Sequence, residues 1–146
     1  MLKMILLLEI KLVTAAVDTN KWSCVIEIDA SNTLEDLHHI IQTAVDFDND
    51  HLYEFMIAKT PQSRNSIRFC DDDEESDNSV TDPTLGEIFP LPPKMYLHYL
   101  FDYGDMWRFK ILYKGASKRM PNVTYPRIIS EKGTKPEQYG RWEDEE

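Results

Sequence analysis

The chain has 146 residues, the size of one ordinary domain, with 42% hydrophobic and 29% charged side chains. This composition excludes disorder along the whole length. The 26 acidic and 16 basic side chains give a net charge of -10, which argues against a nucleic-acid binder that relies on overall charge. No apolar run approaches the roughly 20 residues that a membrane helix needs. Two cysteines are too few for a disulfide scaffold, so we expect a cytoplasmic protein.

The N-terminal segment predicts two strands. Residues 1–13 are apolar at first and then alternate, with Glu9 and Lys11 interrupting the apolar run. This interruption favours a strand over a signal peptide, whose apolar core is longer. Residues 22–28 also alternate between apolar and polar side chains, which is the period of a strand. We expect the two strands to pair as an antiparallel hairpin.

The clearest helix follows this hairpin. Thr33 and Asp36 have the spacing of a capping box, in which two side chains satisfy the first amide groups of a helix. Apolar residues then recur every three or four positions, at Leu34, Leu37, Ile41, Ala44 and Val45. After this helix, residues 51–58 predict a third strand and residues 66–70 predict a short fourth one.

An acidic stretch separates the two halves of the chain. We expect residues of about 71–82 to form a flexible, solvated loop, because they begin with a nearly continuous acidic run. Thr84 and Glu87 repeat the capping-box spacing and predict one short helical turn, which the following prolines end.

Two further strands are expected at residues 94–101 and 106–114, joined by a tight turn at residues 102–105. From about residue 116 to residue 146, prolines and glycines interrupt a polar sequence, and we expect an irregular C-terminal tail. The order of elements predicts a single domain over residues 1–146. It also predicts an α+β fold, a β-grasp-like (ubiquitin-like) roll in which a mixed sheet packs on one main helix.

Basic residues concentrate near the C-terminus although the protein is acidic. Residues 106–130 contain no acidic side chain and six basic ones, namely Arg108, Lys110, Lys114, Lys118, Arg119 and Arg127. Such a basic patch is able to contact phosphate or an acidic partner. The alternative, which the net charge favours, is that these cations pair with the acidic loop of the same chain.

Five residues are candidates for a functional site: His38, His51, Asp102, Asp105 and Trp107. The two imidazoles and two carboxylates are plausible ligands for a divalent metal, or groups for acid–base catalysis. Each residue also has a structural interpretation. His38 borders the apolar face of the helix and suits a partly buried histidine, while the aspartates suit a turn and the tryptophan suits the core. The spacing contains no established metal or nucleophile motif, so both interpretations stay open.

Three stretches of sequence, taken together, resemble one protein family. They read T-L-E-D-L-H-H-I-I-Q at residues 33–42, H-L-Y-E-F at residues 51–55 and Y-L-F-D-Y-G-D-M-W at residues 99–107. Trp22 and the Tyr125-Pro126-Arg127 element agree with the same pattern. The pattern resembles the plasmid pRiA-type ORF-three-like family, whose members occur on plasmids and near insertion elements. This resemblance implies a β-grasp-like α+β roll and puts His38, His51, Asp102, Asp105 and Trp107 on motif positions, but it implies little about activity.

Three hypotheses about function follow. The first is a non-enzymatic protein-interaction module, associated with plasmids or mobile elements, that binds another protein. The second is a metal-dependent or acid–base enzyme that uses His38, His51, Asp102 and Asp105. The third is weak nucleic-acid contact through the basic segment 108–127. We favour the first, with a protein partner, no cofactor and no membrane contact, while the oligomeric state is not predicted by the sequence.

Overall fold

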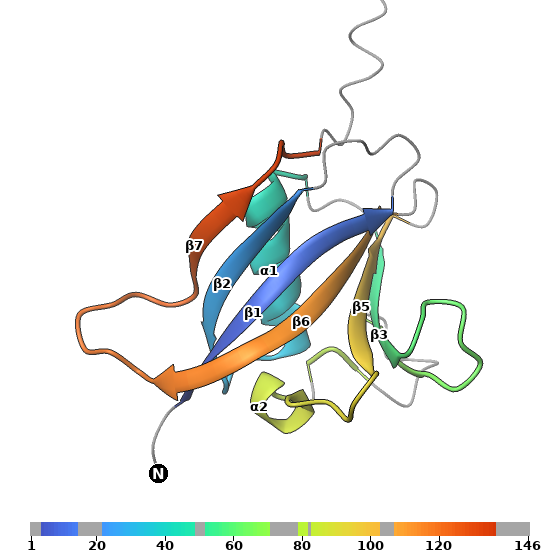
Figure 1. Cartoon of the computed structure of the whole chain (residues 1–146), viewed down its shortest axis with the longest axis horizontal. Helices are drawn as coiled ribbons and strands as arrows, with labels where there is room; N and C mark the ends of the chain where they lie inside the picture. The colour runs from blue at the N-terminus through green and yellow to red at the C-terminus, as the bar shows by residue number, and fades with distance from the viewer. Residues whose placement is uncertain are drawn as a thin grey trace, which may run out of the picture.

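The computed structural model describes residues 4–14, 22–48, 52–70, 79–81, 83–102 and 107–136 (Figure 1). The strands in these ranges are β1 (Met4–Thr14), β2 (Ser23–Asp29), β3 (Tyr53–Ala58), β4 (Ile67–Cys70), β5 (Tyr96–Phe101), β6 (Trp107–Lys118) and β7 (Arg127–Lys132). The helices are α1 (Leu34–Val45) and α2 (Leu85–Ile88). No helix in the described ranges is long and apolar enough to cross a membrane.

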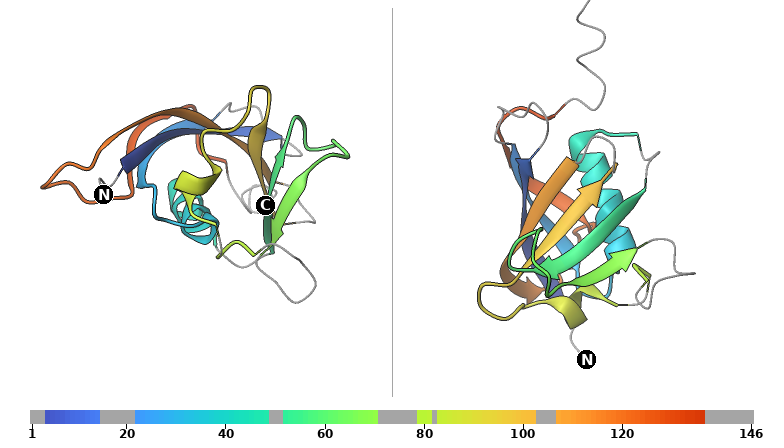
Figure 2. Two further views of the ribbon diagram at one scale, coloured as in Figure 1. Left: turned by 90° about the horizontal axis from the view of Figure 1, so that it is seen from below. Right: turned by 90° about the vertical axis from the view of Figure 1, so that its right-hand side faces the viewer.

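The strands form one 7-stranded sheet in the order β4-β3-β5-β6-β1-β2-β7, and each neighbouring pair is antiparallel. The sheet curves around α1, which lies against its inner face (Figure 2). α1 follows β2 and precedes β3, so it carries the chain across this inner face from one side of the sheet to the other. The predicted hairpin of β1 and β2 is confirmed, as are the helices and the strands expected between residues 33 and 114, with small shifts of their ends.

The β-grasp expectation is wrong. The structure is a 7-stranded antiparallel sheet with two small helices, not a mixed sheet packed on one main helix. The spacing of apolar residues indicates which residues form strands. It does not indicate which edge of the sheet a later strand joins, or whether that strand runs parallel or antiparallel to its neighbour. Here β6 joins the open edge of β1 in the antiparallel direction, from Leu12 opposite Phe109 to Met4 opposite Lys118. As a result, no two of the described strands pair in parallel.

The chain after residue 116 is more regular than its sequence indicates. We expected an irregular tail over residues 116–146, but β6 continues to Lys118 and β7 adds to the edge of β2. Every residue of β7 is exposed, so this strand lacks the alternation of buried and exposed side chains by which strands are recognised in a sequence. Residues 137–146, and the acidic run at residues 71–78, lie outside the described residues.

The core lies between α1 and the inner face of the sheet. Large apolar side chains in the strands or next to them are almost fully buried there, among them Trp22, Phe55, Phe101 and Phe109. Both predicted capping boxes are present: the Thr33 hydroxyl accepts from the Asp36 amide, and the Thr84 hydroxyl accepts from the Glu87 amide. These caps fix the residues at which the helices begin, and so determine which side chains of α1 face the sheet.

Candidate functional site

On the inner face, His38 lies in an aromatic cluster between α1 and the sheet. Its ring stacks on the ring of Tyr53, with 3.6 Å between the ring centroids and an interplanar angle of 2°. Its Nδ1 atom lies 2.6 Å from the hydroxyl oxygen of Tyr99, which also accepts a hydrogen bond from the Gln42 side chain at 3.0 Å. His38 is only 1% exposed. This is the arrangement of a histidine that the core holds by ring packing and hydrogen bonding.

The hydroxyl of Tyr99 is held in its neutral form. Burial raises the pKa of Tyr99 well above its usual value, while the hydrogen bond from Gln42 acts in the opposite direction. The hydroxyl therefore stays protonated at neutral pH and has its hydrogen available to donate to His38. The Oε1 atom of Gln42 is buried without a hydrogen-bond partner in the described part of the chain. The cluster is thus connected by hydrogen bonds and closed to solvent.

Asp102 and Trp107 lie at one end of the sheet, where β5 ends and β6 begins. Asp102 has a left-handed backbone with φ of 65°, and its amide donates to the carbonyl oxygen of Leu52 at 2.9 Å. The Trp107 ring packs edge-on against Phe47, with 5.0 Å between the ring centroids. Both candidate residues are buried, and they close the core at this end.

Half of the predicted metal set falls within the structure. His51 and Asp105 lie outside the described residues. That these two side chains join His38 and Asp102 in one site therefore stays a prediction. Within the described ranges, no group of three or more His, Cys, Asp or Glu side chains is placed to hold a metal ion. His38 already uses its Nδ1 atom in the contact with Tyr99, which removes one of its two ring nitrogens from any ligand role.

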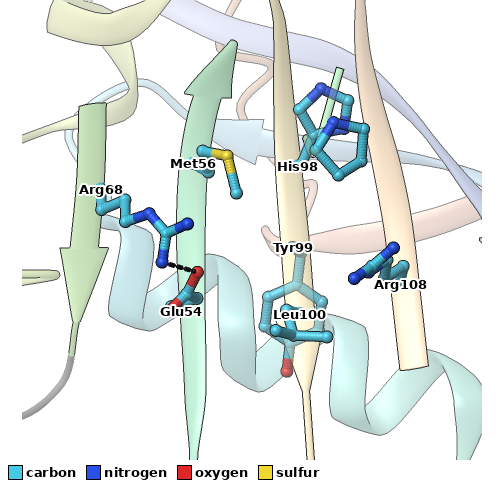
Figure 3. Close-up of a pocket in the computed structure, with 8 residues that line it drawn as sticks. Glu54, Met56, Arg68, His98, Tyr99, Leu100 and Arg108 are labelled. Atoms are coloured by element: carbon cyan, nitrogen blue, oxygen red, sulfur yellow. Dashed lines mark ion pairs between the residues drawn. The ribbon is translucent and has the colours of Figure 1, made fainter. Parts of the chain in front are cut away.

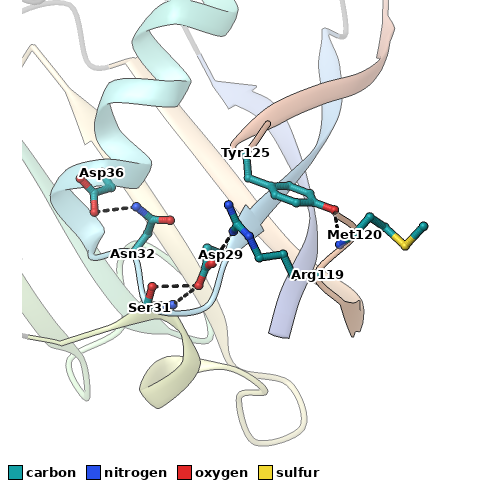
Figure 4. Close-up of polar contacts among 7 residues, drawn as sticks. All are labelled: Asp29, Ser31, Asn32, Asp36, Arg119, Met120 and Tyr125. Carbon is teal, nitrogen blue, oxygen red and sulfur yellow. Dashed lines mark hydrogen bonds and ion pairs between the residues drawn. The ribbon is translucent and has the colours of Figure 1, made fainter. Parts of the chain in front are cut away.

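The six cations of the basic segment do not form one patch. Three of them pair with carboxylates of β1 and β2, at 3.3, 2.7 and 2.6 Å: Lys114 with Glu9, Arg119 with Asp29 and Arg127 with Glu27. Figure 4 shows the Arg119 guanidinium between Asp29 and the ring of Tyr125, whose centroid is 4.9 Å away. The partners of these cations are therefore neighbouring strands, where we had expected the acidic loop. Lys118 is exposed, and Arg108 and Lys110 lie nearer the start of β6, on the face of the sheet opposite α1.

On this outer face, a pocket of about 380 Å³ opens over β3, β4, β5 and β6. Met56, Pro61 and Leu100 give it apolar walls. Its polar side chains lie in front of the strands in Figure 3, with α1 behind them, and they are Glu54, Arg68, His98 and Arg108. Glu54 and Arg68 form an ion pair of 3.4 Å at one side. Mostly apolar walls with a few polar groups are the usual composition of ligand pockets.

His98 gives this pocket a buried acceptor. It is 7% exposed, and its Nε2 atom lies 3.1 Å from the carbonyl oxygen of Ala58. A carbonyl only accepts, so Nε2 carries the hydrogen and Nδ1 of the neutral ring is an acceptor. Burial lowers the pKa of His98, and the charges of Lys110 and Arg108 lower it further against the effect of the Ala58 hydrogen bond. The ring is therefore neutral at pH 7, and its Nδ1 atom has no hydrogen-bond partner among the described residues.

Arg108 is a second polar group of the pocket without a partner. It is half-buried near the start of β6, opposite Leu100 and diagonal to His98 across the pairing of β5 with β6. It makes no ion pair or hydrogen bond in the structure as described. A guanidinium has five donors in a planar fork that matches a carboxylate. Arg108 is thus a donor, beside a buried acceptor, at the mouth of a pocket.

A row of five side chains, three of them cationic, crosses the outer face and shares residues with the pocket. The row consists of successive partners on β4, β3, β5, β6 and β1, namely Arg68, Met56, His98, Lys110 and Lys11. Lys110 also covers the ring of Tyr96, with its Nζ atom 3.8 Å from the ring centroid. We call the pocket and this row the outer-face site. It is locally basic on a protein whose net charge is -10.

The sequence analysis included Arg108 and Lys110 among the basic residues but missed His98 and Arg68. A signal for His98 was present. It alternates with Leu97 and Tyr99, whose side chains are buried in the core, so it faces outward from the middle of the sheet. That a histidine in this position is buried follows only from the neighbouring strands and from the loop that carries Pro61, which the alternation does not report.

Comparison with known proteins agrees with the resemblance noted in the sequence. The family profile described as plasmid pRiA4b ORF-3-like protein matches residues 7–143, nearly the whole chain. Among solved structures, a protein of unknown function, MM3350 from Methanosarcina mazei Go1, is similar with a TM-score of 0.73 and 20% sequence identity. The match covers 90% of this chain and 71% of that chain, and at this identity it concerns the fold alone. No curated protein matches the sequence.

Proposed function

We propose, from the premise that the chain belongs to the family of plasmid pRiA4b ORF-3-like proteins, that it is a non-enzymatic protein-interaction module. In this proposal the module binds an acidic segment of another protein at the outer-face site. A role associated with plasmids or other mobile elements belongs to the proposal, in keeping with the family's description. A cytoplasmic location also belongs to it, because two cysteines do not form a disulfide scaffold.

One observation carries this proposal: Arg108 is half-buried and has no carboxylate partner among the described residues. Three other cations of the same segment have carboxylate partners within the chain, so Arg108 differs from them in having none among the described residues. A partly desolvated guanidinium has lost part of its hydration, and a hydrogen-bonded anion compensates well for that loss. A carboxylate from another molecule supplies that anion. Lys110 and Lys11 lie beside Arg108 and add attraction for further acidic groups of the same partner.

The site favours an acidic polypeptide over a nucleic acid. Binding to nucleic acid depends on several phosphate contacts, and the net charge of -10 repels a polyanion at a distance. The ion pairs of Lys114, Arg119 and Arg127 leave fewer cations for phosphates. For an enzyme, the best-placed histidine of the sequence analysis, His38, lies in the closed core. A polypeptide with a few carboxylates and apolar residues matches both the charges and the apolar walls of the pocket.

The test uses a defined probe, the peptide Glu-Leu-Glu-Leu-Glu-Leu with a free carboxyl end. Titration into the isotope-labelled protein should shift amide resonances of β5 and β6 in nuclear magnetic resonance spectra. Arg108→Glu should weaken binding at least tenfold. Lys118→Glu makes the same charge change on the same strand, away from the site, and should leave the affinity within twofold. Equal losses for the two variants, or resonance shifts confined to residues outside β3, β5 and β6, overturn the proposal.

A further inference from the structure

We infer that the pocket of the outer-face site receives the C-terminal residue of the partner polypeptide. The terminal carboxylate binds Arg108, and the amide N–H of the same residue donates to Nδ1 of His98. This inference rests on the proposed function and names the part of the partner that enters the pocket. The acidic residues before the terminus then lie along Lys110 and Lys11.

The first argument is the pairing of one donor group with one acceptor. Arg108 offers only donors, and the neutral ring of His98 offers an acceptor at Nδ1, because its Nε2 hydrogen is used by Ala58. A ligand that satisfies both must hold an anion and a hydrogen-bond donor close together. An aspartate or glutamate within a chain also has a backbone N–H, but one or two methylene groups separate its carboxylate from the Cα atom that carries this N–H. A C-terminal residue holds its carboxylate and its own amide N–H on one Cα atom, and capture of a chain terminus is an established mode of peptide recognition.

The second argument is the size and lining of the pocket. About 380 Å³ is more than one carboxylate fills, and the remaining walls are the apolar side chains of Met56, Pro61 and Leu100. These walls suit the apolar side chain of a last residue such as leucine. Glu54 occupies the opposite side, paired with Arg68 at 3.4 Å. Its negative charge opposes a second carboxylate in the pocket, so the pocket takes one anion and one apolar group.

An N-acyl amino acid has the same chemistry as a polypeptide terminus. The structure favours the polypeptide because cationic side chains continue beyond the pocket, at Lys110 on β6 and Lys11 on β1. A small molecule that fills the pocket does not extend to these residues, whereas a chain of a few residues does, since successive strands lie about 4.8 Å apart. The inference therefore assigns the pocket to a polypeptide end.

The experiment compares three probes by the same titration. They are Glu-Leu-Glu-Leu-Glu-Leu with a free carboxyl end, the same peptide with a C-terminal amide, and N-acetyl-leucine. We expect the amide to bind at least tenfold more weakly than the free acid. We expect N-acetyl-leucine to shift the same resonances around His98, with an affinity at least tenfold below that of the peptide.

Each other outcome has a defined meaning. If the free acid and the amide bind equally, and Arg108→Glu still weakens both, the terminus is not recognised and this inference fails while the proposed function stands. If N-acetyl-leucine binds as tightly as the peptide, a small molecule is the occupant and the inference fails. If no probe binds, the inference and the proposed function fail together.

A second variant tests the acceptor. His98→Phe keeps a ring in the same place and removes Nδ1, so it should weaken the free acid about tenfold, which is the usual worth of one hydrogen bond to a charged or buried group. Tyr113→Phe, on the far part of β6, is the matched ring substitution and should change nothing. Urea unfolding of each variant checks that it is folded. An unchanged affinity in a folded His98→Phe protein removes His98 from the site.

Discussion

Among the described residues, one buried histidine lies against each face of the sheet, His38 from α1 on the inner face and His98 from β5 on the outer face, and their surroundings differ. On the inner face, His38 stacks on Tyr53 and contacts the hydroxyl of Tyr99. On the outer face, His98 has an Nδ1 atom without a partner among the described residues, in a pocket with the unpaired Arg108. The first environment uses a histidine to fix the packing of a helix on a sheet. The second keeps polar groups available to another molecule.

The comparison distinguishes two roles of a buried polar residue, one in stability and one in binding. Polar groups that are satisfied in a core contribute to stability, and their loss destabilises the fold. Polar groups that are left without partners contribute little to stability and are typical of sites where function sets the sequence. The following predictions test this division, from the largest expected effect to the smallest.

Removing the inner histidine should have the largest effect. His38→Ala removes a ring that packs on Tyr53 at 3.6 Å and leaves a cavity under the sheet, so we expect a loss of about 3 kcal/mol in the free energy of unfolding. His98→Ala should cost only about 1 kcal/mol, because it removes one hydrogen bond to Ala58 at the edge of an open pocket. Urea unfolding monitored by tryptophan fluorescence measures both. Equal losses of stability for the two variants would contradict the distinction between polar groups that stabilise the core and polar groups that are available for binding.

The hydroxyl of Tyr99 should account for a smaller part of this stability. Tyr99→Phe keeps the ring and removes the group between His38 and Gln42, so two buried side chains lose their partner. We expect a loss of about 2 kcal/mol in the same unfolding measurement. Tyr96→Phe on the outer face is the matched control and should change stability by less than about 0.5 kcal/mol. A neutral effect of Tyr99→Phe means that the inner cluster is held by ring packing alone.

The outer histidine should make stability depend on pH. Burial holds the pKa of folded His98 below its ordinary value of 6.5, so the unfolded chain takes up the proton first as the pH falls. The contribution of His98 to stability is therefore complete above about pH 6.5 and is lost as the pH falls toward the folded pKa. The stability difference between the wild type and His98→Gln should shrink between pH 7.5 and pH 5. Denaturation midpoints at several pH values show whether it instead stays constant.

The smallest effect is expected for Arg108. Because it has no ion pair in the described structure, Arg108→Gln should change the free energy of unfolding by less than about 0.5 kcal/mol. Arg119→Gln loses a 2.7 Å ion pair with the mostly buried Asp29. We expect it to lower the free energy of unfolding by only about 1 kcal/mol, because Arg119 is partly exposed and solvent screens the pair. Melting temperatures compare the two variants directly. A larger loss for Arg108→Gln than for Arg119→Gln means that Arg108 supports the fold.

Most secondary structure of this protein is predictable from local sequence. Some features depend only on residues that are close in the sequence, and these are predictable. They are the capping boxes at Thr33 and Thr84 and the alternation of apolar and polar residues in β2, β5 and β6. Sheet order is a different matter. Whether β6 joins β1 in parallel or antiparallel is settled by contacts between residues far apart in sequence, and β7 has no buried side that marks it.

The site was predictable only in part, for a related reason. His38, Asp102 and Trp107 belong to recognisable motifs, and these motifs proved to build the core and its closed end. The outer-face site brings together side chains from five strands, and it is defined by polar groups that lack a partner among the described residues. A sequence lists the residues that are present, but the lack of a partner appears only after every neighbour has been placed.

The pairing of β1 with β6 has a consequence for how the chain is synthesised. Met4 pairs with Lys118 and Glu27 pairs with Arg127, so the first two strands complete their hydrogen bonding only with the last two. On the ribosome, the hairpin of β1 and β2 emerges before β6, and the edge of β1 that β6 later joins stays unpaired until then. Such an edge is open to pairing with other nascent chains. The interval between the synthesis of β1 and that of β6 is therefore the stage at which pairing between copies competes with folding.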